Sequence, residues 1–153
     1  MNEAYLILAR MFEVYSANND LKALVSAVYT QAQKPKGKKN PAIMMWIEGT
    51  ESAVCGVLTD AVLNIVIRSD NPDGFGSELA NIFEVVDVLT NGVHYEKNSV
   101  SCTFRRSGVP VPFGIFDEVE KDYFKHWRYR CKIKRYASTR VKNLSSVARI
   151  SKP

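Results

Sequence analysis

This sequence lacks any long apolar run, and near its start only residues 4–9 are continuously apolar. A helix that crosses a bilayer needs about 20 predominantly apolar residues in succession. The opening residues, Met1 to Glu3, are acidic rather than basic, which is unlike a secretory signal. We therefore expect a protein made in the cytoplasm that has no membrane-spanning segment and no membrane partner.

Cysteine and histidine are also scarce. The cysteines Cys55, Cys102 and Cys131 are odd in number and far apart, with no Cys-x-x-Cys pair, and the histidines are His94 and His126. A zinc site needs ligands at closer spacing than these. We therefore predict no metal site and interpret the cysteines as buried free thiols in strands.

Motifs of enzyme chemistry are missing as well. No glycine-rich phosphate loop precedes a helix, and no Ser or Cys occupies an elbow motif. The acidic residues of 117–122 do not have the spacing of a calcium-binding loop, so we interpret them as a solvated turn. The sequence thus predicts no catalytic residues, no cofactor and no enzyme activity.

Charge is unevenly distributed along the chain, whose formal net charge is +5. Residues 123–153 contain ten Lys or Arg and no acidic side chain, whereas residues 1–122 contain eleven basic and sixteen acidic side chains. An acidic body with a net charge of −5 is therefore followed by a basic C-terminal fifth with +10. Such an asymmetry favours charged partners.

Two segments predict the main helices, residues 3–16 and residues 78–90, the second capped by Ser77 and ended by Asn91-Gly92. The first is apolar almost all round, so either the body of the domain wraps it closely or a neighbouring subunit covers one side. In the second helix, two valines project from the otherwise polar side. The candidate subunit interface therefore consists of Tyr5, Leu8, Phe12, Val85 and Val88.

Strand signals occupy most of the remaining sequence, with a short helical stretch at 21–26. The expected extended segments are residues 27–33, 43–47, 56–69, 100–106 and 123–136. This order predicts one α+β domain over residues 1–136, with a mostly antiparallel sheet and two main helices packed on one face. Residues 137–153 are expected to be a basic C-terminal extension, partly extended or flexible.

The segment 123–136 alternates between two kinds of side chain. Tyr123, Trp127, Tyr129, Cys131 and Ile133 share one predicted face, on which Lys125 is the exception. The opposite face is predicted to carry His126, Arg128, Arg130, Lys132 and Lys134.

Three interpretations of this basic face remain open: a solvated surface, a docking surface for acidic proteins, and a contact with nucleic acid. A second basic feature is the loop that carries Lys34, Lys36, Lys38 and Lys39.

The order of these elements resembles the tail terminator, or tail-completion, family of tailed bacteriophages, including the neck terminators of contractile tails. The resembling features are the N-terminal helix running into residues 21–25, the extended residues 28–29, the Pro-initiated strand 41–47, the strand ending at 63–68, the helix 78–90 ending at Asn-Gly, and the aromatic, basic strand 127–134. The basic loop at 34–40 and the basic C-terminal end depart from the family pattern, so a contractile and a non-contractile tail both remain open.

The resemblance implies a structural virion protein of the tail or neck. By that resemblance, six copies form a ring that caps the tail tube, ends its growth and joins the tail to the head. The implied partners are further copies of the chain, the tail tube protein, head-tail connector or neck proteins, and DNA passing through the lumen.

The alternative, argued from the residues alone, is a small nucleic-acid-binding module that uses the basic C-terminal strand and arm. Neither predicted main helix is basic, which disfavours a DNA-reading helix. Salt-dependent retention on DNA distinguishes the two functions, because phosphate contacts release counterions.

Overall fold

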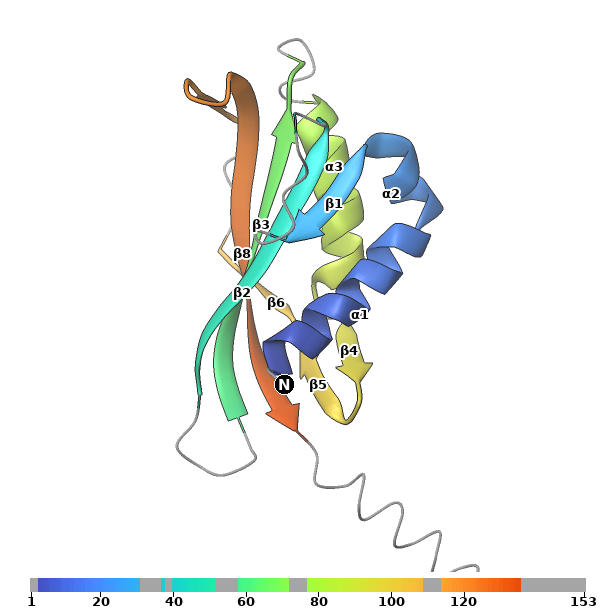
Figure 1. Cartoon of the computed structure of the whole chain (residues 1–153), viewed down its shortest axis with the longest axis vertical. Coiled ribbons are helices and arrows are strands. Elements are labelled where there is room, and N and C mark those ends of the chain that lie inside the picture. The colour runs from blue at the N-terminus through green and yellow to red at the C-terminus, as the bar shows by residue number, and fades with distance from the viewer. Residues whose placement is uncertain are drawn as a thin grey trace, which may run out of the picture.

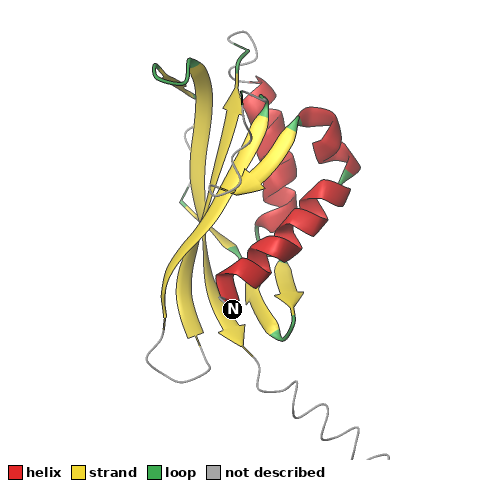
Figure 2. Ribbon diagram, viewed as in Figure 1, coloured by secondary structure: helices red, strands yellow, loops and turns green. Residues whose placement is uncertain are grey.

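The computed structural model describes residues 3–30, 37, 40–51, 58–71, 77–108 and 114–135. These residues form three helices and one eight-stranded sheet (Figures 1 and 2). The helices are α1 (Glu3–Ala17), α2 (Asn19–Leu24) and α3 (Ser77–Thr90). The strands are β1 (Ala27–Thr30), β2 (Ala42–Glu51), β3 (Leu58–Ser69), β4 (His94–Lys97), β5 (Val100–Thr103), β6 (Arg105–Ser107), β7 (Ile115–Asp117) and β8 (Asp122–Arg135).

The sheet is built around β8, and its strand order is β1-β2-β3-β8-β5-β4. The strands β6 and β7 also pair with β8, and every pair is antiparallel except the parallel pair of β1 with β2. The longest ladder joins β3 to β8, from Leu58 opposite Lys134 to Ser69 opposite Tyr123. The predicted fold class, an α+β domain with a mostly antiparallel sheet, is confirmed.

The helices cover one face of the sheet, and the core lies between the two layers (Figure 1). On β3, Leu63, Ile65 and Ile67 point into this core, as predicted from their period of two. Burying each such side chain stabilises the fold by about 1.5–3 kcal/mol. The helices contribute the buried residues Leu6, Ile7, Met11, Tyr15, Leu79, Ile82 and Val86.

The predicted cap Ser77 is itself the first residue of α3, whereas capping features are present at two other helix ends. The side chain of Asn18 accepts a hydrogen bond from the Leu21 N–H at 2.9 Å and so begins α2. Beyond α3, Gly92 has a φ of +76°, a conformation that glycine adopts without steric cost. The chain therefore turns sharply from α3 into β4.

The sequence prediction of one strand over residues 100–106 is wrong, because the chain divides into β5 and β6 at Phe104. The Phe104 N–H donates to the Val93 carbonyl at 3.2 Å, and the Phe104 carbonyl accepts from the Gly92 N–H at 2.7 Å. Both backbone groups are thus bonded to the connection between α3 and β4. The short strand β4 was not predicted either, and β2 is longer than the predicted 43–47.

The interpretation of residues 117–122 as a solvated turn is also partly wrong. Only 1% of Asp122 is exposed, and its carboxylate accepts from Arg68 Nη1 at 2.7 Å and from Asn40 Nδ2 at 3.0 Å. Asp117 accepts from the same Arg68 Nη1 at 3.2 Å and from two backbone N–H groups of the turn. These carboxylates therefore fix the hairpin of β7 and β8 to β3.

A buried hydrogen bond between the hydroxyls of Tyr15 and Thr90 joins α1 to the end of α3. We predict that Thr90→Val lowers the free energy of unfolding by about 1–3 kcal/mol, because the buried Tyr15 hydroxyl loses its partner. Urea denaturation measures this change. The double variant Tyr15→Phe/Thr90→Val is the control, and it should lose less than the sum of the two single variants. Strict additivity of the two losses would contradict the prediction.

Candidate partner-binding surface

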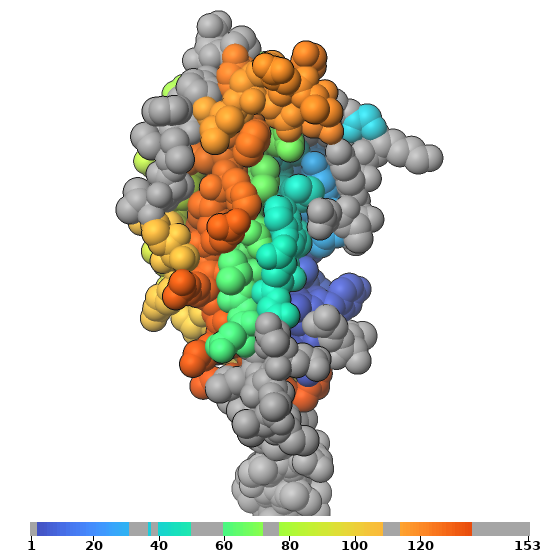
Figure 3. Space-filling model, turned by 90° about the vertical axis from the view of Figure 1, so that its left-hand side faces the viewer, coloured from blue at the N-terminus to red at the C-terminus, as the bar shows by residue number. Residues whose placement is uncertain are grey.

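The face of the sheet opposite the helices presents β2, β3 and β8 directly to the surface (Figure 3). The structure confirms the predicted alternation along β8. Its inward side chains, Trp127, Tyr129, Cys131 and Ile133, are buried, and so is Lys125, the exception. Its outward side chains are the five predicted basic residues, all of which are exposed: His126, Arg128, Arg130, Lys132 and Lys134.

A buried polar network holds β8 against α3. The indole N–H of Trp127 donates to the Tyr129 hydroxyl at 2.8 Å, which in turn donates to Asp87 Oδ1 at 2.7 Å. Burial raises the pKa of Tyr129 well above its usual value, so the phenol keeps its proton and remains a donor. Arg106 binds the second oxygen of Asp87 at 2.7 Å. The outward basic residues thus stand on a strand whose inner side is firmly packed.

Asn64 of β3 organises part of the outer face, although it is only 1% exposed. Its Oδ1 lies 3.0 Å from His126 Nε2 and 3.0 Å from Arg128 Nε, so one amide oxygen positions two basic side chains. The Asn64 Nδ2 has no hydrogen-bond partner within the described ranges. The ring of Trp46 packs against His126 with centroids 5.7 Å apart.

A pocket of about 440 Å³ opens beside this cluster, where β8 meets β5 and β6. β5 pairs with β8 as far as Ser101 opposite Lys134, and pairing resumes only at Arg105 opposite Arg130. The pair expected between them, Thr103 with Lys132, is absent from the ladder. The gap follows from the bonding of the Phe104 backbone to Gly92 and Val93 instead of to β8.

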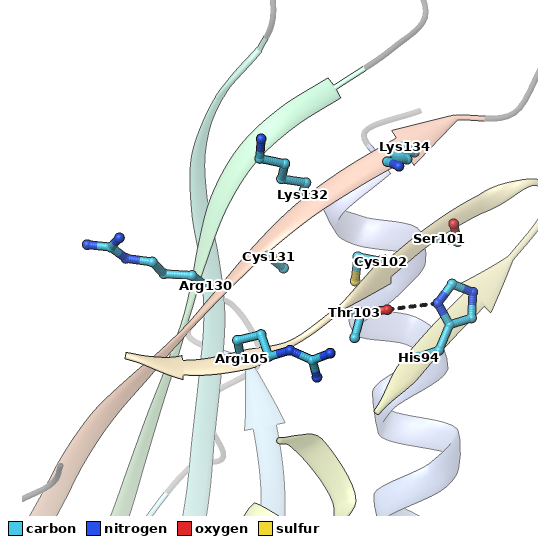
Figure 4. Close-up of a pocket in the computed structure, with 9 residues that line it drawn as sticks. All are labelled: His94, Ser101, Cys102, Thr103, Arg105, Arg130, Cys131, Lys132 and Lys134. Carbon is cyan, nitrogen blue, oxygen red and sulfur yellow. Dashed lines mark hydrogen bonds between the residues drawn. The ribbon is translucent and has the colours of Figure 1, made fainter. Parts of the chain in front are cut away.

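Four of the nine residues that line this pocket are Lys or Arg (Figure 4). Arg105 extends beneath Thr103, whose hydroxyl lies 3.0 Å from Nδ1 of His94. A hydrogen bond with Cys131 and burial raise the pKa of the Cys102 thiol, so this group carries no negative charge. The nine lining residues are His94, Ser101, Cys102, Thr103, Arg105, Arg130, Cys131, Lys132 and Lys134.

The permanent cations of this pocket have no partner among the described residues, whereas five other cations of the domain pair with carboxylates. Within the part of the chain that the structure describes, the side chains of Arg105, Arg130, Lys132 and Lys134 form no ion pair or hydrogen bond. Asp60 lies opposite Lys132 in the ladder, but the two side chains do not pair. The cations that do pair with carboxylates are Arg10, Arg68, Lys97, Arg106 and Arg135.

The predicted interface residues have different environments. Tyr5 is 59% exposed and Val88 is 76% exposed, as the interface hypothesis requires. Leu8, Phe12 and Val85 are instead half-buried and pack against the core, so the domain itself covers much of α1. The basic loop with Lys34, Lys36, Lys38 and Lys39, the third cysteine Cys55, and the extension 137–153 lie outside the described residues.

Sequence reasoning missed the part of the pocket that β4, β5 and β6 supply. His94 lies outside the predicted strands. Thr103 and Arg105 lie in the predicted segment 100–106, but only the pairing of β6 with β8 brings Arg105 opposite Arg130. Among the described side chains, no group of three His, Cys, Asp or Glu is placed to hold a metal ion. None of the helices in those ranges has the length and apolar character needed to cross a bilayer.

Comparison with known proteins defines the fold and nothing further. No protein-family model matches the chain, and no curated protein matches its sequence. Six solved chains match its structure. One of them is 12% identical, with a TM-score of 0.60 over 86% of this chain and 93% of its own length. At that identity the likeness establishes a shared architecture, and the function must be argued from the surface.

Burial, and secondarily the positive charge of Arg128, lower the pKa of His126 below its usual 6.5. We predict that an NMR titration of the His126 imidazole gives a pKa below 6.5 and that Arg128→Gln raises it. The variant His94→Gln serves to assign the two histidine signals.

The same pKa shift has a consequence for stability. Below pH 6.5 the unfolded chain binds more protons at this site than the folded one, so the free energy of unfolding should fall as the pH drops through the folded-state pKa. A pKa of 6.5 or higher for His126 would contradict both expectations.

Proposed function

We propose that the protein is a tail terminator of a tailed bacteriophage, a ring-forming virion protein that caps the tail tube and joins the tail to the head. The observation that carries this proposal is the two-sided construction of the domain. Helices cover one face of the sheet, whereas the other face presents the outward cations Arg128, Arg130, Lys132 and Lys134, which have no carboxylate partner among the described residues. Such a domain is suited to be one layer of a larger assembly.

The element order supports the same proposal. The structure contains the features on which the family resemblance rests: a long first helix, the short α2, the strand β2 beginning after Pro41, the long β3, and α3 ending at Asn91-Gly92. This support is one of architecture, because many functions share one fold.

Ring assembly requires two different patches on each subunit, because head-to-tail contacts join unlike surfaces. The domain offers such a pair. Tyr5 is exposed on α1, and Val88 is exposed on α3.

A nucleic-acid-binding module is the second candidate, favoured by the unpaired cations of the pocket. Phosphate groups could neutralise them, with an affinity that falls steeply with salt. The aromatic residues of β8 do not support this function, since Trp127 and Tyr129 are buried beneath the strand and present no stacking surface. Trp46 lies on the outer face, but it is half-buried against His126.

Deletion of this gene from its parent phage genome tests the proposed function. Electron microscopy of the resulting particles should reveal filled heads without attached tails, and tail tubes of uncontrolled length. Complementation with the wild-type gene should restore joined virions of normal length. Normal joined virions in the deletion strain would refute the terminator function and leave nucleic-acid binding as the better candidate.

Within a ring, the exposed Val88 should contact a neighbouring subunit. We predict that Val88→Glu prevents self-association and tail capping, because an unpaired charge buried in a contact is costly. Asn81→Glu adds the same charge at another exposed position of α3 and should leave both properties intact. Sedimentation velocity and complementation of the deletion strain measure them. If the Val88→Glu protein assembles as well as the Asn81→Glu protein, this face of α3 is not the contact.

A further inference from the structure

The residues that line the pocket between β5, β6 and β8 indicate the charge of the ligand that it binds. We propose that it binds an acidic, extended segment of a partner protein, with carboxylates of that segment neutralising Arg105, Arg130, Lys132 and Lys134. This proposal rests on the proposed function and deepens it, because it assigns the chemistry of the docking partner and the residues that receive it.

The first argument is electrostatic. Arg105 lies opposite Arg130 in the ladder, and Lys132 and Lys134 follow on the same face of β8, so four cations surround one opening. None of the nine lining residues is Asp or Glu, and the Cys102 thiol stays protonated. Cations held together in this way repel one another until a ligand of opposite charge is bound.

The second argument is the contrast within the same domain. Arg106 follows Arg105 directly but points to the inner side, where it binds Asp87 at 2.7 Å. Arg68 similarly bridges Asp117 and Asp122. The domain thus supplies carboxylates to arginines that support its fold, whereas those of the pocket receive none from the described residues.

The third argument is the spacing of the cations. Alternate residues of a strand lie about 6.4–6.8 Å apart on one face. Arg130, Lys132 and Lys134 therefore repeat at the interval of alternate side chains in another extended peptide. A segment with Asp or Glu at every second position can present a carboxylate to each cation in turn. The planar guanidinium groups of Arg105 and Arg130 also suit two-pronged binding of carboxylate oxygens.

The lining favours a peptide over a nucleic acid. It contains no Phe, Tyr or Trp on which a base could stack, and its volume of about 440 Å³ lies within the range of ordinary ligand sites. The ligand should therefore be recognised through its charges and its backbone repeat.

Fluorescence anisotropy with defined probes tests this assignment. The acidic probe is a labelled peptide of six Glu-Ser repeats, and the matched neutral probe has six Gln-Ser repeats. A labelled oligothymidylate of twelve nucleotides supplies phosphates instead. The full-length protein is compared with Arg105→Gln and Arg130→Gln, and with Lys22→Gln, which removes one positive charge from an exposed position of α2. Circular dichroism melting verifies that each variant is folded.

The acidic peptide should bind the wild-type protein, and the neutral peptide should not. Each pocket variant should raise the Kd of the acidic peptide about tenfold, as expected for the loss of a charge-assisted hydrogen bond, whereas Lys22→Gln should change it less than about twofold. If Lys22→Gln weakened binding of the acidic peptide equally, the net charge of the protein would account for the binding, and the proposal would be overturned. A failure of the acidic peptide to bind would also overturn it. Tighter binding of oligothymidylate, weakened by the same pocket variants, would overturn it in favour of nucleic acid.

These outcomes are separable from those of the gene deletion. If the peptide bound at the pocket but the deletion strain made normal joined virions, only the proposed terminator function would be refuted. If the deletion strain made defective tails but the peptide did not bind, only the proposed ligand of the pocket would be refuted.

Discussion

The pairing of β3 with β8 is the constraint from which the other features of the domain follow. It runs the whole length of β3, and its register determines which side chains of both strands share a face. A shift by one residue would turn Trp127 and Tyr129 outward and bury Arg128 and Arg130 against the helices. Because that exchange would bury unpaired charges, the hydrophobic core and the basic surface specify the same register.

The C-terminal end of α3 is the second point on which the architecture depends. Asp87 binds Tyr129 and Arg106, Thr90 binds Tyr15, and the connection after the helix takes both backbone groups of Phe104. These contacts connect α3 to β8, β6 and α1. Because the backbone of Phe104 bonds to Gly92 and Val93, it does not pair with β8. The pocket lies at this interruption of the ladder.

Local periodicity accounts for what could be predicted from the sequence. Three features depend only on residues that are close together in the sequence: the alternation of β8, the buried face of β3 and the end of α3 at Asn91-Gly92. The structure confirms all three. The division of residues 100–106 and the place of Arg105 in the pocket depend on pairings between segments distant in sequence. Likewise, the apolar pattern of α1 could not reveal how much of Leu8 and Phe12 the domain itself covers. Whether the outer cations meet protein, nucleic acid or solvent is a question that no local pattern decides.

The outward and inward side chains of β8 are under different constraints on substitution. Arg130, Lys132 and Lys134 contribute charge to the surface, while the residues between them, among them Cys131 and Ile133, fill the core. Replacement of an outward residue alters the surface and leaves the packing intact, as is usual for exposed positions. Over evolution, descendants of this chain can therefore exchange one binding partner for another at alternate positions of a single strand while the fold stays the same.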